Sequence, residues 1–303
     1  MKLRLGTRRS ALALAQSGQF AKLLEGCHPG LEVELVGLTT TGDTTAGSLA
    51  KVGGKGLFTE QLEAGLLDGS LDLAVHSLKD LPVELPAGLV IAAHPPRGGP
   101  RAAVGRRHAA LAGLPEGSRV LTGSLRRRAQ LLDRRPDLAI EDIRGNVDTR
   151  LRKWRELGAA AVVLAMAGLK RLGLESSEAP ASALDPVEII PAPGQGTLAV
   201  EVAESSEAQA LCAALDDPAT AAASAAERSV VAAFGGDCTL PLAAWARPED
   251  DGWRIRTFVG PRVGGGTGIR AEAHAADPRA AARSAIATLQ ERGAHDLLRN
   301  TGD

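Results

Sequence analysis

The strongest constraint on the fold is an alternation of strand-like and helix-like segments through the first two thirds of the chain. Residues 2–6 and 31–38 have the pattern of strands, and Ser10 is placed to cap a helix that runs to about Glu25. Further strands are predicted near 71–75, 89–93, 119–121, 139–143, 161–164 and 198–202, and further helices near 58–68, 125–135, 147–157 and 165–172. Strands that alternate with helices form largely parallel sheets, so we predict an α/β fold.

Two proline-bearing segments, 95–100 and 191–194, interrupt this alternation. They predict two α/β lobes joined by a double crossover, a hinged layout in which a ligand binds between the lobes. The C-terminal segment differs, with helices near 218–234 and 278–293 flanking three strand-like stretches, and it predicts a small α+β domain. The expected domains are 1–95 with 195–214, then 100–190, then 217–303.

Composition excludes several classes of protein. The formal net charge is -1, so the molecule as a whole is neither a polyanion nor a polycation, and no apolar stretch is long enough to span a bilayer. The three cysteines are widely spaced and form no CxxC motif, which argues against a disulfide framework and against a zinc site. The N-terminus has no signal-peptide pattern. We therefore expect a cytoplasmic protein that has no resident metal and does not bind membranes.

Cations gather in residues 124–155, which hold ten Lys and Arg against five Asp and Glu, a local excess of +5. Ser124–Arg127 and Ile143–Asn146 lie at two predicted strand-to-helix junctions, where free backbone N–H groups and the helix dipole favour an anion. We interpret Arg126, Arg127, Arg144 and Arg150 as an anion site. Four other arginines are assigned to a solvated helical face: Arg128, Arg134, Arg135 and Arg152.

The abundance of Arg over Lys also has a neutral explanation in codon bias, since Ala and Gly are abundant too. Nucleic-acid binding is the rival interpretation of the cationic segment. Aromatic residues make up only 2% of the chain and Tyr is absent, so stacking platforms for bases are scarce. Small polycarboxylates fit the segment better, and we expect no nucleic-acid partner.

Three further motifs have both a functional and a structural interpretation. His76–Asp80 follows a predicted strand, so Asp80 either holds developing positive charge beside Lys79 or closes an Asx turn. Lys51–Gly56 is either a mobile cover carrying two cations or a plain surface loop. Cys238, in the Gly-rich run Gly235–Pro241, is either an attachment point or a structural thiol.

Taken together, these segments resemble the porphobilinogen deaminase (hydroxymethylbilane synthase) family. Their order and spacing match the family over most of the chain. The matching stretches are Gly6–Ala13, Thr41–Asp43, Lys51–Phe58, His76–Pro82, Gly123–Arg127, Ile143–Val147, Thr149–Leu151, Ala167–Gly173, Pro191–Gly196 and Cys238–Pro241. Each stretch alone is weakly specific, whereas the set is highly specific. The resemblance implies three domains, two of them like periplasmic binding proteins.

The resemblance also implies an activity. It is that of a transferase of porphyrin and heme biosynthesis, which joins four porphobilinogen molecules into a linear tetrapyrrole on a dipyrromethane cofactor, attached here to Cys238. Asp80 matches the catalytic aspartate, which we expect to be buried and to stabilise a passing positive charge. The implied cofactor and substrate contacts are Arg8, Ser10, Ser77, Lys79, Ser124, Arg126, Arg127, Arg144, Asn146, Arg150, Arg171 and Gln195. Asp43, Lys51, Lys55 and Phe58 match an active-site loop. A monomer is expected, with at most transient contact with the next enzyme of the pathway.

Two residues depart from the family pattern. Asp237 stands before the cysteine where many members have Gly, and Gly123 stands where others often have Ser or Thr. A carboxylate beside Cys238 would slow thiolate chemistry, but the thioether forms only once, so attachment is still expected. The alternative function is a non-catalytic two-lobe binding protein for a small dicarboxylate, which would carry no covalent adduct.

Overall fold

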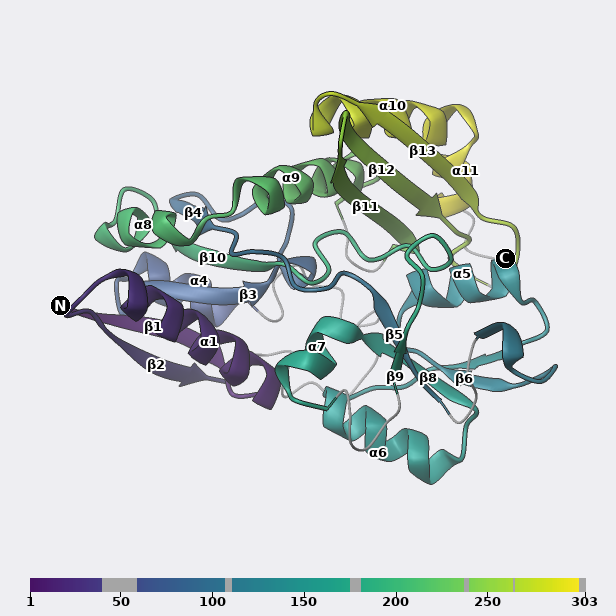
Figure 1. Ribbon diagram of the computed structural model, residues 1–303, viewed down its shortest axis with the longest axis horizontal. Coiled ribbons are helices and arrows are strands. Elements are labelled where there is room, and N and C mark those ends of the chain that lie inside the picture. Colours follow the sequence, from purple (N-terminus) through teal and green to yellow (C-terminus); the bar gives the residue numbers. More distant parts are fainter. Residues whose placement is uncertain (40–58, 107–110, 175–180, 237–239, 264, 300–303) are drawn as a thin grey trace. The chain divides into compact units, whose positions relative to one another are not determined.

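The computed structural model describes residues 1–39, 59–106, 111–174, 181–236, 240–263 and 265–299. The chain forms two compact units. Unit 1 comprises Met1–Gly98 and Thr197–Ala221, and unit 2 comprises Gly99–Gly196 and Ala222–Asp303. The chain therefore passes from one unit to the other three times (Figure 1).

Unit 1 is built on a five-stranded sheet of order β2-β1-β3-β10-β4. Strand β1 is parallel to β2 and β3, whereas β10 is antiparallel to both β3 and β4. The elements are β1 (Lys2–Arg8), α1 (Ala11–Cys27), β2 (Glu32–Leu38), α4 (Glu60–Leu67), β3 (Leu73–Ser77), the 3-10 turn η1 (Leu78–Asp80), β4 (Leu89–Ala93), β10 (Leu198–Ala203), α8 (Glu207–Cys212) and η3 (Ala213–Leu215).

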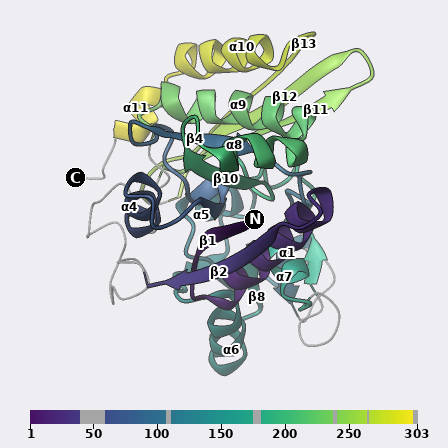
Figure 2. The same cartoon turned by 90° about the vertical axis from the view of Figure 1, so that its left-hand side faces the viewer.

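Helices cover both faces of this sheet. On one face of the sheet, Phe20 and Leu24 of α1 pack with Leu5 of β1 and Val75 of β3. On the opposite face, Leu62 of α4 packs against the sheet. Figure 2 shows α1 and α4 on opposite sides of the strands. A sheet covered on both faces needs nearly continuous apolar strands, and the central strand β3 is apolar from Leu73 to Val75 before His76 and Ser77.

Unit 2 contains a second five-stranded sheet, of order β7-β6-β8-β5-β9. Strand β6 is parallel to β7 and β8, and β5 is antiparallel to β8 and β9. The elements are β5 (Ala102–Arg106), η2 (Leu111–Gly113), β6 (Arg119–Leu121), α5 (Leu125–Arg134), β7 (Ala139–Glu141), α6 (Val147–Leu157), β8 (Ala161–Ala165), α7 (Met166–Arg171) and β9 (Ala181–Ala183).

The two five-stranded sheets share one plan. In each, a single antiparallel strand lies between the third parallel strand and the edge strand. In each, that strand is the first strand after the chain has crossed from the other unit: β5 follows the crossing at 98/99, and β10 follows the crossing at 196/197. Both crossings lie at the proline-bearing segments that the sequence pointed out.

The C-terminal part of unit 2 is a three-stranded antiparallel sheet of order β11-β12-β13. Helices α9 and α10 cover one face of it with small and aliphatic side chains such as Ala226 and Leu289. The elements are α9 (Pro218–Ala233), which begins in unit 1, then β11 (Leu242–Glu249), β12 (Gly252–Val259), β13 (Ile269–Ala275), α10 (Pro278–Glu291) and α11 (Ala294–Arg299).

The second face of this small sheet packs on α5. Asp133 of α5 accepts hydrogen bonds from the Gly268 backbone N–H at 2.8 Å and from Arg270 Nη2 at 2.6 Å. Beside them, Phe258 packs with Ala129 of α5 in a small apolar cluster. The helix whose first turn holds Arg126 and Arg127 is therefore anchored at its other end by the C-terminal sheet.

The α/β prediction is confirmed, with two mostly parallel sheets and helices on their faces. Strands β5 and β9 and helix α8 were not predicted, because Ala102–Arg106 and Ala181–Ala183 are short and poor in β-branched residues. The described residues form three sheets, one in each expected domain. The chain divides into two compact units, however, so the three-domain division stays a prediction. Among the helices of the described segments, none has the length and apolar character needed to cross a bilayer.

The Asp133 contacts yield a stability prediction. Asp133→Ala should lower the free energy of unfolding by about 1–3 kcal/mol, because it leaves a part-buried guanidinium and a backbone N–H without their acceptor. Urea unfolding followed by circular dichroism measures this. The matched control is Glu156→Gln, which breaks the exposed pair with Arg152 and should change the same quantity by less than about 0.5 kcal/mol. Equal effects of the two variants would contradict the anchoring role of Asp133.

Candidate functional site

The expected site residues of unit 1 lie at the carboxyl ends of two neighbouring parallel strands. Arg8 ends β1, and Ser77 ends β3 and is followed directly by Lys79 and Asp80 in η1. The antiparallel strand β10 begins at the same edge, where Leu198 pairs with Ser77. In open α/β sheets this edge is where ligands bind, so the topology brings these residues to a binding edge.

Hydrogen bonds within unit 1 already engage the two serine hydroxyls. Ser10 caps α1, as predicted, by accepting from the Ala13 N–H at 3.3 Å. Ser77 Oγ accepts from Gln16 Nε2 of the same helix at 3.0 Å. These contacts fix the start of α1 against the end of β3, whereas the expected ligand-binding role of the two serines stays a prediction.

Asp80 is exposed, so the expectation of a buried carboxylate was wrong. The reason lies in its two apolar neighbours: Leu78 and Leu81 are both buried in a small cluster with Ala199 of β10. The Leu81 N–H also bonds the Leu78 carbonyl at 3.1 Å and closes the turn. The turn is therefore held in place by its two buried leucines, and the Asp80 carboxylate faces the solvent.

In unit 2 the cationic first turn of α5 is buried. Ser124 caps the helix by accepting from the Arg127 N–H, and Arg126 and Arg127 are only 6% and 5% exposed. Arg126 Nη1 donates to the Ile190 carbonyl at 2.9 Å. Arg127 Nη1 donates to the Val163 carbonyl at 2.9 Å, and its Nη2 donates to Gln195 Oε1 at 3.3 Å.

These two guanidinium groups carry charge without a matching anion. Within the described part of the chain, no carboxylate forms an ion pair with either of them, and Arg127 Nε has no hydrogen-bond acceptor. Burial lowers the pKa of Arg126 to about 10. Burial, together with the charges of Arg126 and Arg150, lowers the pKa of Arg127 well below its usual value. Buried charges are ordinarily paired, so this arrangement favours binding of an anion.

The remaining expected contacts of unit 2 are less buried, apart from Gln195. Arg144 Nε pairs with Asp142 at 2.8 Å, and Arg150 Nε donates to the Gly145 carbonyl at 2.6 Å. Asn146 precedes α6 and is exposed. Arg171 donates to the Gly196 carbonyl at 2.9 Å, and burial lowers its pKa. Gln195 is fully buried, and its amide N–H donates to the Pro100 carbonyl, which fixes the acceptor that it offers to Arg127.

The helical face that was assigned to solvent is only partly exposed to it. Arg134 and Arg152 are exposed as expected, but for Arg128 and Arg135 the assignment was wrong, since both are half-buried. Arg135 pairs with Asp137 at 2.7 Å and donates to the carbonyls of residues 111 and 114, so it holds a loop in place.

Gly123, one of the two departures from the family pattern, has a structural reason. A Cβ added at this position would lie 2.6 Å from the Ile143 carbonyl oxygen. A larger residue would therefore push apart the ends of the two strands β6 and β7. The other departure, Asp237, lies outside the described residues, as do Asp43, Lys51, Lys55, Phe58 and Cys238.

The sequence analysis missed Glu227 of α9. Its side chain is fully buried and accepts from two backbone N–H groups, that of Gly194 at 2.6 Å and that of Ala246 at 2.8 Å. It thus ties the loop that presents Gln195 to strand β11. A lone acidic residue within the Ala-rich run of α9 was the available signal.

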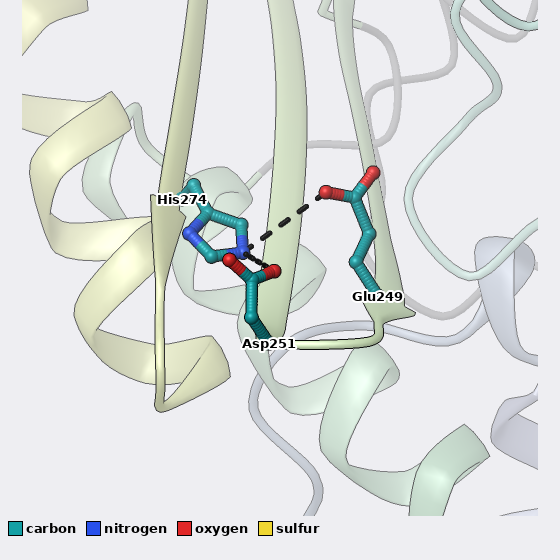
Figure 3. A group of neighbouring side chains, drawn as sticks. All are labelled: Glu249, Asp251 and His274. Atoms are coloured by element: carbon teal, nitrogen blue, oxygen red, sulfur yellow. Dashed lines mark ion pairs between the residues drawn. The ribbon is translucent and has the colours of Figure 1, made fainter.

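One group of side chains in unit 2 has the donors of a metal site. Glu249, Asp251 and His274 converge at the β11–β12 turn, with His274 Nε2 lying 3.1 Å from Asp251 Oδ1 and 4.0 Å from Glu249 Oε2 (Figure 3). Glu249, however, is already neutralised by Arg254 and Arg247, each at 2.7 Å. A carboxylate that two guanidinium groups hold is a poor ligand for a cation, so we assign this group to the surface ion-pair network.

This network predicts a pH-dependent stability. Hydrogen bonding from Arg254, with a smaller contribution from Arg247, lowers the pKa of Glu249 to about 2. The folded-state pKa is depressed, so the stabilisation is complete above the unfolded-state pKa and is lost as pH falls towards about 2. Glu249→Gln should therefore lower the melting temperature at pH 7, and the difference from wild type should shrink below about pH 4.5.

Thermal scans of both proteins between pH 7 and pH 3 measure this difference. Asp251→Asn is the matched control, because it removes an exposed carboxylate from the same group without touching an arginine pair, and it should shift the melting temperature little. A difference for Glu249→Gln that stays constant down to pH 3 would refute the assignment.

Comparisons with known proteins identify the family of the chain. The family model described as "Porphobilinogen deaminase, dipyromethane cofactor binding domain" matches residues 3–210. The chain is 47% identical to the porphobilinogen deaminase of Xanthomonas euvesicatoria pv. vesicatoria over 301 residues, covering 98% of each chain. It is 45% identical to that of Stenotrophomonas maltophilia, again covering 98% of each, and 46% identical to that of Syntrophotalea carbinolica, covering 98% of this chain and 95% of the relative. The chain belongs to the porphobilinogen deaminase family.

Proposed function

We propose that this chain is a transferase that joins four porphobilinogen molecules head to tail into the linear tetrapyrrole hydroxymethylbilane. Ammonia is released at each addition, and the product grows on a covalently bound dipyrromethane primer. One observation carries the proposal beyond family membership. The first turn of α5 buries two guanidinium groups that have no carboxylate partner within the described residues. A site of this kind suits a ligand that brings its own carboxylates.

The chemistry of the ligand fits these residues. Each pyrrole of the substrate and of the primer carries an acetate and a propionate, so a growing chain accumulates negative charge. Guanidinium groups bind carboxylates through two parallel hydrogen bonds, and burial strengthens that attraction. Arg126 and Arg127 would hold carboxylates at the start of α5. The other contacts proposed for primer and substrate are Arg8, Ser10, Ser77, Lys79, Ser124, Arg144, Asn146, Arg150, Arg171 and Gln195.

The proposed attachment point of the primer is Cys238, through a thioether. When bound, the primer supplies the free pyrrole carbon to which the first substrate unit is joined. Gly235 and Gly236, which lead into this segment, both adopt positive φ, at 103° and 68°, so α9 ends in a turn that glycine favours. Asp43, Lys51, Lys55 and Phe58 are proposed to form a loop that covers the site.

Asp80 is proposed to be the catalytic carboxylate. The substrate becomes electron-poor as its ammonia leaves, and a carboxylate held at a fixed point stabilises that positive charge. The anchoring of η1 by Leu78 and Leu81 supplies the fixed point. Since Asp80 is exposed, water must be excluded by the ligand and by the proposed cover for the interaction to reach full strength.

The proposal extends to the cellular context. Three widely spaced cysteines suit a reducing compartment, so we place the enzyme in the cytoplasm. We further propose that it acts as a monomer on a small-molecule substrate, independently of membranes and nucleic acids. Contact with the next enzyme of the pathway would be transient.

Intact-mass measurement of the purified protein tests the primer assignment. Wild type should carry a mass excess equal to two linked pyrrole units, and Cys238→Ser should lack it, because the substituted hydroxyl is a far weaker nucleophile than a thiolate. Cys27→Ser is the matched control and should keep the excess, since Cys27 is an exposed thiol at the end of α1. Active protein of unmodified mass would refute the primer and would favour a non-catalytic binding protein.

Steady-state kinetics test the role of Asp80. Asp80→Ala should keep the mass excess but lower kcat about 100-fold or more, the usual cost of deleting one preorganised electrostatic group. Glu84→Gln changes an exposed carboxylate four residues further on and should leave kcat unaltered. Substantial turnover by Asp80→Ala would reject the catalytic assignment.

A further inference from the structure

Three ionisable side chains lie buried inside unit 1, below the edge that carries Asp80. Glu63 of α4 and His76 of β3 are each 7% exposed, and Glu201 of β10 is fully buried. Acidic and imidazole groups are seldom placed in a core unless they are paired. None of the three has a part in the function proposed above.

The strand register explains why the three side chains meet. In the antiparallel pair of β3 and β10, His76 lies opposite Ala199 and Glu201 lies opposite Ala74. His76 and Glu201 are therefore diagonal neighbours on one face of the sheet. Ala74 on this face packs with Leu62 of α4, and Glu63 is the next residue of that helix. The three ionisable side chains therefore meet on the face of the sheet that α4 covers.

Within the cluster, His76 and Glu201 lie at ion-pair distance. His76 Nε2 lies 2.9 Å from Glu201 Oε2. Among the described residues, neither Glu201 oxygen has a hydrogen-bond donor in good geometry, so the imidazole is the partner that stabilises this carboxylate. Burial raises the pKa of Glu63, and the negative charge of Glu201 raises it further while His76 opposes the shift.

The ion pair also lies close to Asp80 along the chain. His76 is followed by Ser77, the last residue of β3, and then by η1. The Leu78 N–H bonds the Thr197 carbonyl at 3.1 Å, immediately before β10 begins. The turn that presents Asp80 is consequently set by how β3 lies against β10, and the His76–Glu201 pair links these two strands through their side chains.

We propose that His76 and Glu201 are positioning residues for Asp80, whose ion pair fixes the end of β3 against β10 and so sets the place of the catalytic carboxylate. The inference rests on the catalytic role proposed for Asp80. Small displacements of a catalytic group lower kcat strongly, since about 1 Å of misplacement reduces a rate about 100-fold. Ser77 and Lys79 lie on the segment that the pair fixes, whereas the proposed primer and substrate contacts of unit 2 do not depend on the pair, so KM for porphobilinogen should change much less than kcat.

The key variant is Glu201→Gln, assayed as holoenzyme for kcat, KM, melting temperature and intact mass. It should lower kcat about 10-fold or more, leave KM within about 2-fold and keep the primer mass. The matched control is Asp72→Asn, which breaks the ion pair between Asp72 and Arg4 at the opposite end of β3, where Nη2 and Oδ1 are 2.8 Å apart. It should lower the melting temperature as well but leave kcat unchanged.

A second variant distinguishes a loss of positioning from a loss of stability. Glu201→Gln alone leaves His76 buried opposite an amide, whereas the double variant His76→Gln with Glu201→Gln removes both charges together. Replacing both members of a buried pair is far less destabilising than removing one. The double variant should therefore melt closer to wild type than Glu201→Gln and should still have a reduced kcat, because two flexible amides do not restore the fixed geometry.

A double-mutant cycle with Asp80→Glu shows whether the effect passes through Asp80. In that background the carboxylate is already displaced, so Glu201→Gln should lower kcat less than it does in wild type. Unchanged kcat in a stable Glu201→Gln protein, or equal losses in both backgrounds, would overturn the inference while leaving the role of Asp80 intact. Full turnover by Asp80→Ala would instead overturn the proposed role of Asp80 and, with it, this inference.

Discussion

The first turn of α5 holds two guanidinium groups away from water, and within the described residues their hydrogen-bond partners are carbonyl and amide oxygens only. An isolated buried charge is expensive, and the free energy for holding Arg126 and Arg127 there must come from the packing around them. The anchoring of α5 at its other end by Asp133, Gly268 and Arg270 is part of that packing. The proposed ligand, which brings carboxylates to this turn, would recover the electrostatic free energy that folding left unsatisfied.

The shared plan of the two five-stranded sheets bears on how such a site is assembled. Each sheet is completed by a strand that arrives directly from the other unit, β5 in one case and β10 in the other. Each sheet is incomplete without the strand that follows a crossing, so the chain at each crossing leads directly into a sheet and is not a separate linker. Gln195 lies just before the second crossing and bonds both Arg127 and Pro100, so a site residue stands where the chain leaves unit 2.

The sequence predicted the α/β class, the crossings at the two proline-bearing segments and the Ser10 cap of α1, because these depend on local patterns of apolar and capping residues. It separated Arg126 and Arg127 from the solvated helical face, but it did not predict that these two are buried or that Arg128 is half-buried. Arg126 and Arg127 differ from Arg128 and Arg134 only in helical phase, and the buried phase depends on the sheet against which α5 packs. Strand β5 escaped prediction for a related reason, since its position comes from pairing with β8 and β9 rather than from its own residues. The exposure of Asp80 likewise follows from the tertiary burial of Leu78 and Leu81.

Buried or part-buried acidic residues recur where segments distant in sequence must be held in register. Glu227 ties the loop before Gln195 to β11, Asp133 ties α5 to the C-terminal sheet, and Glu201 pairs with His76 between β3 and β10. An apolar contact at any of these places would give comparable burial but would tolerate sliding. An acceptor with fixed donors does not, because each displacement leaves a buried charge partly unsatisfied. The role proposed for Asp80 requires its carboxylate to return to the same place at each of four condensations with a lengthening ligand. The close approach of His76 to Glu201 links β3 to β10 beneath Asp80, and we expect it to meet that requirement better than packing alone.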